Sequence, residues 1–151
     1  GKLSYFINVF RSIIKYHPVE IDINVDGKDY HFKKVFISAI QNGKYFGGGM
    51  KATPNADPTD DKYIICIAHN LSKLTLQLLL VTIYPGWHRF IKGKVTMLTG
   101  TNIKIKHPSE TYFQADGEVM GNINEVEIKP VQKRTFIAFN KKDFKNKSAT
   151  Q

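Results

Sequence analysis

Apolar residues at the start of the chain recur every three or four positions. This spacing is typical of one face of an amphipathic helix, and it predicts a helix over Leu3–Ile14 that packs against the rest of the protein. His17-Pro18 ends the pattern, because proline disfavours helical geometry in the residue before it.

After Pro18 the apolar period changes to two. Apolar and polar residues alternate over Val19–Val25, which indicates a half-buried strand, and Asp26-Gly27 then predicts a hairpin turn. We expect the return strand to run through Tyr30 and Phe32. The mostly apolar run Val35–Ile40 predicts a further strand that is buried on both faces.

The remaining segments predict short strands and one more helix. Residues 42–61 are rich in Gly, Pro, Asn and Asp and predict a long loop, after which Tyr63–Ile67 predicts a strand. Ser72 can cap a helix that ends by Pro85. Five later segments are strand candidates: Val95–Leu98, Ile103/Ile105, Tyr112–Ala115, Val126/Ile128 and Thr135–Phe139. This pattern predicts a mainly β fold, a two-layer antiparallel β-sandwich with an N-terminal helix and one further short helix.

The composition indicates a cellular compartment and shows that the charge is unevenly distributed along the chain. The chain has 151 residues, of which 42% are hydrophobic and 23% charged, and no apolar run is long enough to span a bilayer. Its single cysteine, Cys66, cannot form an internal disulfide, which fits a reducing cytoplasm. Most of the net charge of +9 lies in residues 129–151, which hold seven Lys and Arg against one Asp. We therefore expect one β-sandwich domain, residues 1–139, followed by a basic tail, residues 140–151.

Three segments could carry chemistry, and each also has a plain structural interpretation. Gly47-Gly48-Gly49 permits unusual backbone angles, which suit a ligand-binding loop or a tight structural loop. The carboxylates of residues 54–61 could bind a hard cation, although Asp and Pro are also common turn residues. Asp116-Gly117-Glu118 could supply a general base or could be a hairpin turn. Taken one at a time, each segment favours the structural interpretation.

Taken together, the order and separation of these segments resemble the C-terminal domain of the diacylglycerol kinase-like lipid kinase family. That family includes bacterial diacylglycerol kinases and sphingosine kinases, and the resemblance covers about residues 1–139. The matching segments are the Tyr5–Ile14 helix, Asn42-Gly43, Gly47-Gly48-Gly49, Ala52-Thr53-Pro54-Asn55-Ala56, Asp60-Asp61 and Asp116-Gly117-Glu118. The family's ATP-binding loop, of Gly-Gly-Asp-Gly-Thr type, belongs to an N-terminal domain and does not occur in this chain.

The resemblance implies that the chain is the C-terminal half of an ATP-dependent lipid kinase. Such an enzyme phosphorylates a lipid hydroxyl, diacylglycerol-like in this family, and the nucleotide would be bound mainly by the missing domain. The chain alone is therefore expected to be inactive. The resemblance also implies that Glu118 is the catalytic base that accepts the hydroxyl proton, with Asp116 as the neighbouring carboxylate and rival candidate.

The resemblance further implies a magnesium site in the loop. Its ligands would be the carboxylate of Asp61 and the backbone carbonyls of Pro58 and Tyr63, and this ion would be distinct from the Mg²⁺ that accompanies ATP. The sequence departs from the family pattern directly after Asp61, where Lys62-Tyr63-Ile64-Ile65 replaces the frequent Gly-Leu-Leu-Asp. The positive charge of Lys62 should weaken cation binding.

The implied partners are a lipid substrate at the membrane surface, the protein's own N-terminal domain and anionic headgroups at the inner membrane face. No nucleic acid is expected in this interpretation, and the enzyme would be cytoplasmic and peripheral. The alternative is a non-catalytic basic β-sandwich that binds an anionic membrane or nucleic acid. Tyr84–Phe90 has the amphipathic character for a membrane surface, but we expect Trp87 and Phe90 to fold into the core. The five histidines show no metal-ligand spacing and are expected at the surface or half-buried.

Overall fold

The computed structural model describes residues 17–130, which form one antiparallel sheet, one α-helix and one short 3-10 helix. In chain order the elements are β1 (Val19–Val25), β2 (Lys28–Gln41), β3 (Tyr63–His69), α2 (Lys73–Thr82), η1 (Trp87–Phe90), β4 (Val95–Gly100), β5 (Ile103–Ala115) and β6 (Glu118–Ile128). Neither of the described helices has the length and apolar character to cross a bilayer.

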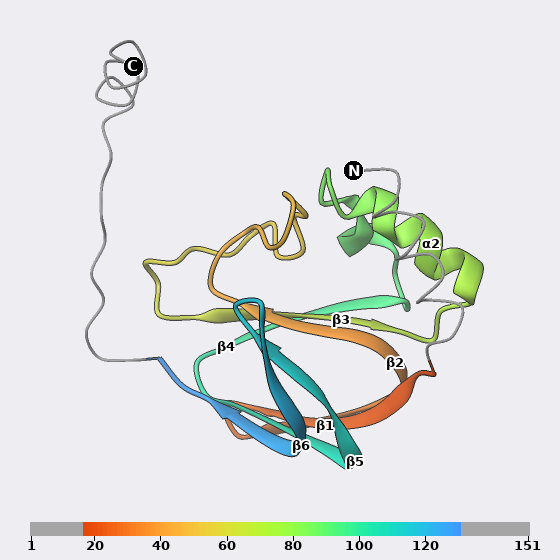
Figure 1. Cartoon of the computed structure of the whole chain (residues 1–151). Coiled ribbons are helices and arrows are strands. Elements are labelled where there is room, and N and C mark those ends of the chain that lie inside the picture. Colours follow the sequence, from red (N-terminus) through yellow and green to blue (C-terminus); the bar gives the residue numbers. More distant parts are fainter. Residues whose placement is uncertain (1–16, 131–151) are drawn as a thin grey trace, which may run out of the picture.

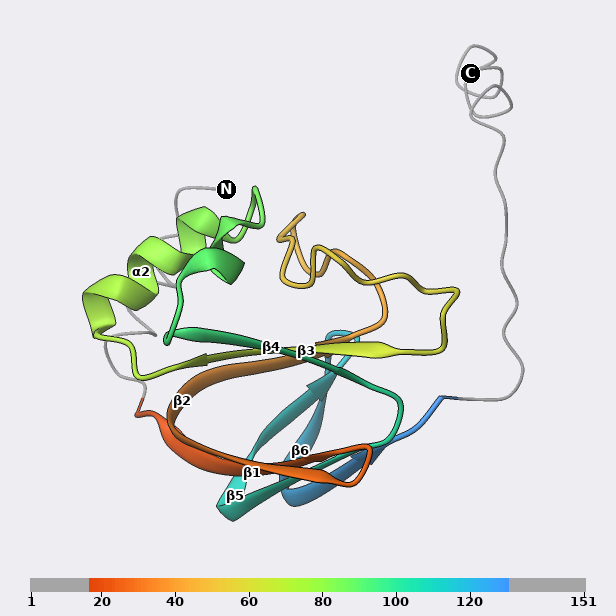
Figure 2. The same cartoon turned by 180° about the vertical axis from the view of Figure 1, so that it is seen from behind.

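The six strands form a sheet that folds over on itself into two layers. Neighbouring strands follow the order β4-β3-β2-β1-β5-β6, and every pair is antiparallel. Figures 1 and 2 show β3 and β4 in the upper layer and β1, β5 and β6 in the lower one, with β2 curving from one to the other. The curve coincides with a register shift at Val35, next to Lys34 with its φ of 52°. The predicted two-layer, mainly β fold is confirmed.

Aliphatic side chains fill the space between the two layers. Ile21 and Ile23 of β1 pack there with Ile65 and Ile67 of β3, and each exposes 1% or less of its surface. Burial of this apolar surface is the main force that holds the layers together. A second cluster lies between the upper layer and α2: Phe36, Cys66, Ala68, Leu71, Leu76, Leu79 and Val95. The helix α2 therefore forms a third layer on the outer face of the sandwich.

Local sequence signals begin several of these elements. Asp26 and Gly27 have φ values of 51° and 88°, as a two-residue turn between β1 and β2 requires. The Asp26 carboxylate accepts hydrogen bonds from the backbone N–H groups of Asn102 and Thr101, which hold its pKa below the usual value. Ser72 caps α2 by accepting a hydrogen bond from a backbone N–H of the first turn, at 3.1 Å. The predicted hairpin and helix start are both confirmed.

Two pairs of predicted strands are in fact single strands. The return strand through Phe32 and the run Val35–Ile40 both belong to β2, while Ile103/Ile105 and Tyr112–Ala115 both belong to β5. In β2 the register shift between Val35 and Ile37 changes which face is buried, and this interrupts the period-two pattern in the sequence. In β5 the interruption has another cause, because the polar residues that follow Ile105 begin the part of the strand where no side chain is buried. The predicted helix Leu3–Ile14, the candidate strand Thr135–Phe139 and the basic tail lie outside the described residues.

The prediction for residues 84–90 was wrong. Trp87 and Phe90 expose 64% and 65% of their surface instead of folding into the core, whereas His88 between them is fully buried. The expectation that the histidines lie at the surface or half-buried is therefore wrong for His88. Gly86, at a φ of 79°, turns the chain back at the end of α2, and a Cβ there would lie 2.9 Å from the Pro54 side chain. This close approach brings η1 against the loop that follows β2.

Candidate functional site

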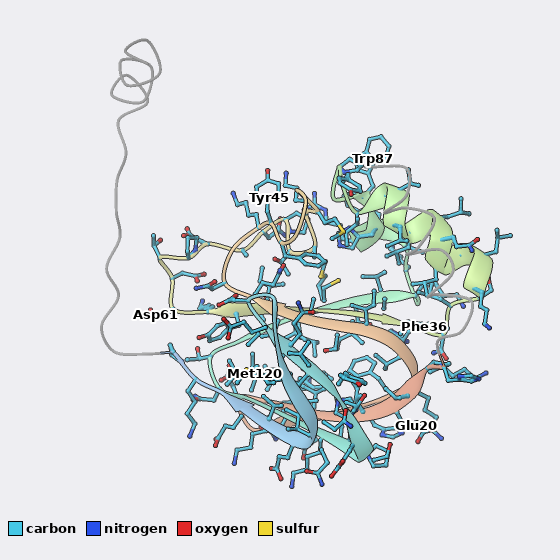
Figure 3. All side chains as sticks on the ribbon, viewed as in Figure 1. Glu20, Phe36, Tyr45, Asp61, Trp87 and Met120 are labelled. Atoms are coloured by element: carbon cyan, nitrogen blue, oxygen red, sulfur yellow. The ribbon has the colours of Figure 1, made fainter. Side chains whose placement is uncertain are left out.

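The glycine segment and the acidic segment both belong to the loop of residues 42–62, which lies on the outer side of the upper layer (Figure 1). The loop of residues 42–62 and the α2–η1 segment both lie above β3 and β4 in Figure 1. Figure 3 places Tyr45 of the loop and Trp87 of η1 on this same side of the molecule. Asp116-Gly117-Glu118 belongs to a different part of the fold, because it is the turn of the β5–β6 hairpin.

Thr53 fixes the loop of residues 42–62, which we call the motif loop, to the end of β2. The residue is fully buried, and its hydroxyl oxygen lies 2.7 Å from the backbone carbonyl oxygen of Gly43 and 2.8 Å from Oε1 of Gln41. The single hydroxyl proton is donated to one of these two acceptors at a time. A buried hydroxyl without such a partner would cost about 1–3 kcal/mol, so these contacts define the position of the loop.

His88 and Arg89 join η1 to the same loop. Nε2 of His88 donates a hydrogen bond to the backbone carbonyl of Ala52 at 2.8 Å, and Nη1 of Arg89 donates to Oδ1 of Asn55 at 2.8 Å. Burial lowers the pKa of His88, although the backbone carbonyls of Ala52 and Thr82 favour the protonated ring. The ring is therefore neutral near pH 7 and serves as a buried donor that positions the loop.

Sequence reasoning missed His88, because the residue belongs to no motif and to no metal-ligand spacing. The only signal in the sequence is indirect. Gly86 two positions earlier permits the left-handed backbone that turns the chain back toward the loop. The role of His88 follows only from the three-dimensional contact between η1 and residue 52.

The glycine segment is a tight turn. Phe46 and Met50 close it with two reciprocal backbone hydrogen bonds of 3.0 and 3.1 Å. Gly47 and Gly49 have φ values of 49° and 91°, a region that favours glycine over residues with a Cβ. The segment has the backbone of the tight loop that its glycines predict.

The acidic end of the loop consists largely of turns. Oδ1 of Asp57 accepts hydrogen bonds from the backbone N–H and the hydroxyl of Thr59, and Oδ1 of Asp60 accepts one from the backbone N–H of Lys62. These contacts are ordinary turn chemistry, as the residue types predict. Within residues 17–130, no group of three or more His, Cys, Asp and Glu side chains is arranged to hold a metal ion.

A cation in this loop would depend mostly on neutral oxygen ligands. Asp61 is exposed at a φ of 58° and could contribute its carboxylate, together with the backbone carbonyls of Pro58 and Tyr63. An all-oxygen set of this kind suits Mg²⁺, which commonly keeps several water ligands that an exposed loop can accommodate. Lys62 is also exposed and adjacent in sequence, so its charge opposes binding. By their chemistry alone, these residue types would suit a weak site in which water supplies most of the ligands.

The Asp116-Gly117-Glu118 segment forms the turn that its sequence predicts. Asp116 and Gly117 have φ values of 47° and 95°, and Glu118 begins β6 opposite Ala115 of β5. All three residues of the motif are exposed. A turn of this kind is compatible with a catalytic carboxylate, because it presents the Glu118 side chain at the tip of a hairpin.

The hairpin that carries Glu118 extends beyond the sandwich core. β5 pairs with β1 only near its beginning, from residue 103 to residue 106, and no side chain in residues 106–130 is buried. Tyr112, Val119 and Met120 expose 81%, 67% and 59% of their surface, and Figure 3 labels Met120 on this arm. Apolar side chains gathered on an exposed arm are typical of a surface that meets another protein surface.

Comparison with known proteins identifies the family for most of the chain. Residues 1–135 match the family described as the YegS C-terminal NAD kinase beta sandwich-like domain. The chain is 29% identical over 119 residues to the candidate lipid kinase YtlR of Bacillus subtilis (strain 168). It is 27% identical over 118 residues to a diacylglycerol kinase of Mycobacterium tuberculosis (strain CDC 1551 / Oshkosh). These matches cover 79% and 78% of the chain but only 38% of each relative, so the chain spans about two-fifths of their length.

Solved structures show the same fold. The crystal structure of a candidate diacylglycerol kinase from Bacillus anthracis str. Sterne matches 85% of the chain and 42% of its own chain, with a TM-score of 0.65 and 18% sequence identity. The sequence match, the matching fold and the ordered motifs agree with one another. The chain therefore belongs to the YegS C-terminal NAD kinase beta sandwich-like family, the C-terminal domain of the diacylglycerol kinase-like lipid kinases.

Proposed function

We propose that this chain is the C-terminal half of an ATP-dependent kinase that phosphorylates the hydroxyl of a diacylglycerol-like lipid. The ordered family motifs and the relatives named as lipid or diacylglycerol kinases support this assignment. The observation that carries it is Glu118, an exposed carboxylate that directly follows the two-residue turn at the tip of the β5–β6 hairpin. A general base must reach its substrate, and this position leaves the carboxylate accessible.

The chemistry assigned to Glu118 is the removal of one proton. As the lipid hydroxyl oxygen bonds to the γ-phosphorus of ATP, its O–H bond breaks and the Glu118 carboxylate accepts the proton. The bond from the γ-phosphorus to the bridging oxygen breaks at the same centre, and ADP leaves with that electron pair. The rest of catalysis is positioning and charge balance, which the nucleotide-binding domain would supply.

The exposed arm is the part of this chain best suited to meet that other domain. Its apolar residues Tyr112, Val119 and Met120 lie close in sequence to Glu118, so covering them would place a second surface beside the carboxylate. Contact between the domains would also exclude water from the reacting atoms, which strengthens electrostatic interactions there. In this proposal the kinase is cytoplasmic and works at the inner face of the membrane.

The Mg²⁺ assigned to Asp61 gives a prediction of its own. In the complete kinase, Asp61→Asn should raise the Mg²⁺ concentration for half-maximal activity by roughly tenfold or more, because it removes the only charged ligand. Asp60→Asn is the matched control, since the Asp60 carboxylate accepts a backbone hydrogen bond within the loop. The measurement is kinase activity against Mg²⁺ at fixed MgATP. If the Asp61 variant needs the same Mg²⁺ concentration as the parent, the loop has only a structural role.

The proposal as a whole is tested by phosphoryl transfer in the complete protein. Labelled ATP and mixed micelles that contain diacylglycerol, a sphingoid base or another lipid alcohol should yield a phosphorylated lipid with at least one of these substrates. This chain alone should give none, because its sequence lacks the nucleotide-binding loop. If no lipid alcohol is phosphorylated, the basic character of the chain, with a net charge of +9, would favour a non-catalytic module that binds an anionic membrane or nucleic acid.

A further inference from the structure

The helix α2 is apolar on both of its faces. Leu76 and Leu79 are buried against the sheet, whereas Leu74, Leu78 and Val81 point outward and expose 69%, 60% and 64% of their surface. Positions four and three apart lie on one side of a helix, so these three residues form a continuous stripe. A surface helix of a globular protein normally has a polar outer face, and an apolar one indicates that something else covers it.

More exposed aromatic side chains follow the helix, on the segment that turns back at Gly86 and contacts α2. These residues are Tyr84, Trp87 and Phe90. Tyr45 of the facing loop is 60% exposed and lies on the same side of the molecule as Trp87 in Figure 3. We call the set of Leu74, Leu78, Val81, Tyr84, Trp87 and Phe90 the α2–η1 surface. Its exposed aromatic rings are those that prefer the boundary between water and lipid.

This surface is held in place and is not the result of a loose segment. The fully buried His88 lies between Trp87 and Phe90 and donates a hydrogen bond to the backbone carbonyl of Ala52. Arg89 is held by Asn55. The two aromatic side chains are thus pointed outward by a buried neighbour, against the ordinary preference that would bury the rings and expose the imidazole.

Positive charge surrounds the apolar side chains. From residue 71 to residue 100, which includes α2 and η1, the sequence contains no Asp or Glu, while it contains Lys73, Arg89, Lys92 and Lys94. Two cations lie over exposed rings on this side of the molecule. The guanidinium carbon of Arg89 is 4.6 Å from the centroid of Phe90, and Nζ of Lys51, on the facing loop, is 5.7 Å from that of Tyr45. Exposed Lys92 follows two residues after Phe90. An apolar stripe bordered by cations complements a lipid bilayer with anionic headgroups.

We infer that the α2–η1 surface binds the protein to an anionic lipid bilayer, with Trp87 and Phe90 inserted at the level of the headgroups. Lys and Arg at its border attract the negatively charged leaflet, and the apolar stripe enters the boundary between headgroups and acyl chains. The choice of a lipid occupant rests partly on the proposed function, because that function places the substrate in a membrane. The binding itself can be measured without any phosphoryl transfer, so the two proposals can fail separately.

The test compares variants of the complete protein in sedimentation with phosphatidylcholine vesicles, with and without phosphatidylglycerol. The double variant Trp87→Ala/Phe90→Ala should lower affinity for the phosphatidylglycerol vesicles by roughly tenfold or more, which corresponds to about 1.4 kcal/mol. Trp87→Phe/Phe90→Tyr is the matched control, because it keeps an aromatic ring at both positions and should retain most of the affinity. Lys92→Gln should weaken binding mainly at low salt, where surface charges are least screened.

Trp87 also supplies a direct signal. It is the only tryptophan of this chain, so the fluorescence difference between the parent and Trp87→Phe isolates its emission, which should shift to shorter wavelength with phosphatidylglycerol vesicles. Equal affinity of the parent and the double variant would overturn the inference, as would binding that does not depend on phosphatidylglycerol. A parent that self-associates without vesicles, and becomes monomeric in the double variant, would instead assign the surface to a second copy of the chain.

Discussion

Replacing Glu118 with Gln in the complete kinase should lower the turnover number by about 10²–10⁴-fold. A lipid hydroxyl is a poor nucleophile, and a carboxylate that accepts its proton contributes a factor of this size. Gln keeps the length of the side chain and part of its hydrogen bonding but cannot act as the base. The measurement is steady-state phosphorylation of the lipid at saturating ATP, with the Michaelis constant for ATP expected to stay nearly unchanged.

The same substitution should leave the fold intact. Glu118 is exposed at the start of β6, and substitutions at such positions usually change the free energy of unfolding by no more than about 0.5 kcal/mol. Thermal unfolding of the parent and the Glu118→Gln variant should therefore coincide. A loss of turnover without a loss of stability is the result that a purely structural turn would not produce.

Asp116→Asn is the control that separates the two carboxylates. Asp116 has a φ of 47°, and Asn is among the few residues that tolerate this left-handed backbone, so the turn should survive the change. If Glu118 is the base, the Asp116 variant should retain most of the turnover. The larger loss in the Asp116 variant would transfer the role to that residue, and near-normal turnover in both would remove this turn from the mechanism.

The sequence predicts much of the fold because several elements are determined locally. Asp26-Gly27 sets the first hairpin and Ser72 begins α2, and both act through hydrogen bonds or backbone angles within a few residues. The full extent of β2 could not be predicted in this way. That strand passes from one layer of the sandwich to the other, so its buried face changes at the register shift near Val35 and the alternation of the sequence is lost.

The segment Trp87–Phe90 shows the same limit at the candidate membrane surface. Hydrophobicity ranks its two aromatic residues as interior and its histidine as exposed, and the structure has the opposite arrangement. The reason is a long-range contact, because His88 reaches back to Ala52 across 36 positions of the chain. The order of the motifs predicted the family, but the neighbours of each motif residue depend on contacts that no local pattern contains.

That contact gives the second large prediction, a loss of stability on replacing His88 with Leu. Leu fills much of the same space but leaves the buried carbonyl of Ala52 without a donor, which should cost about 1–3 kcal/mol of the free energy of unfolding. Gln is the matched control, because its Nε2 can donate to the same carbonyl. Urea unfolding of this chain at pH 8, followed by far-UV circular dichroism, should place His88→Gln between the parent and His88→Leu. Equal stability of all three would show that the hydrogen bond contributes nothing.

The pH dependence of stability should identify His88 more specifically than its removal does. Burial lowers the pKa of His88 in the folded protein below the ordinary value of about 6.5, so the unfolded chain takes up a proton at a pH where the folded one does not. The contribution of the neutral ring to the free energy of unfolding is therefore complete above about pH 6.5, and it is lost as the pH falls through the lower folded-state pKa.

His69 and His107 have pKa values lowered chiefly by burial as well, so the parent should lose stability steeply on acidification. His88→Gln has no proton to take up at this position and should lose stability less steeply below pH 6.5, by up to about 1.4 kcal/mol for each pH unit in the window. Parallel pH profiles for the parent and the Gln variant would mean that folding does not lower the pKa of His88, and the buried, neutral state assigned to its ring would then be wrong.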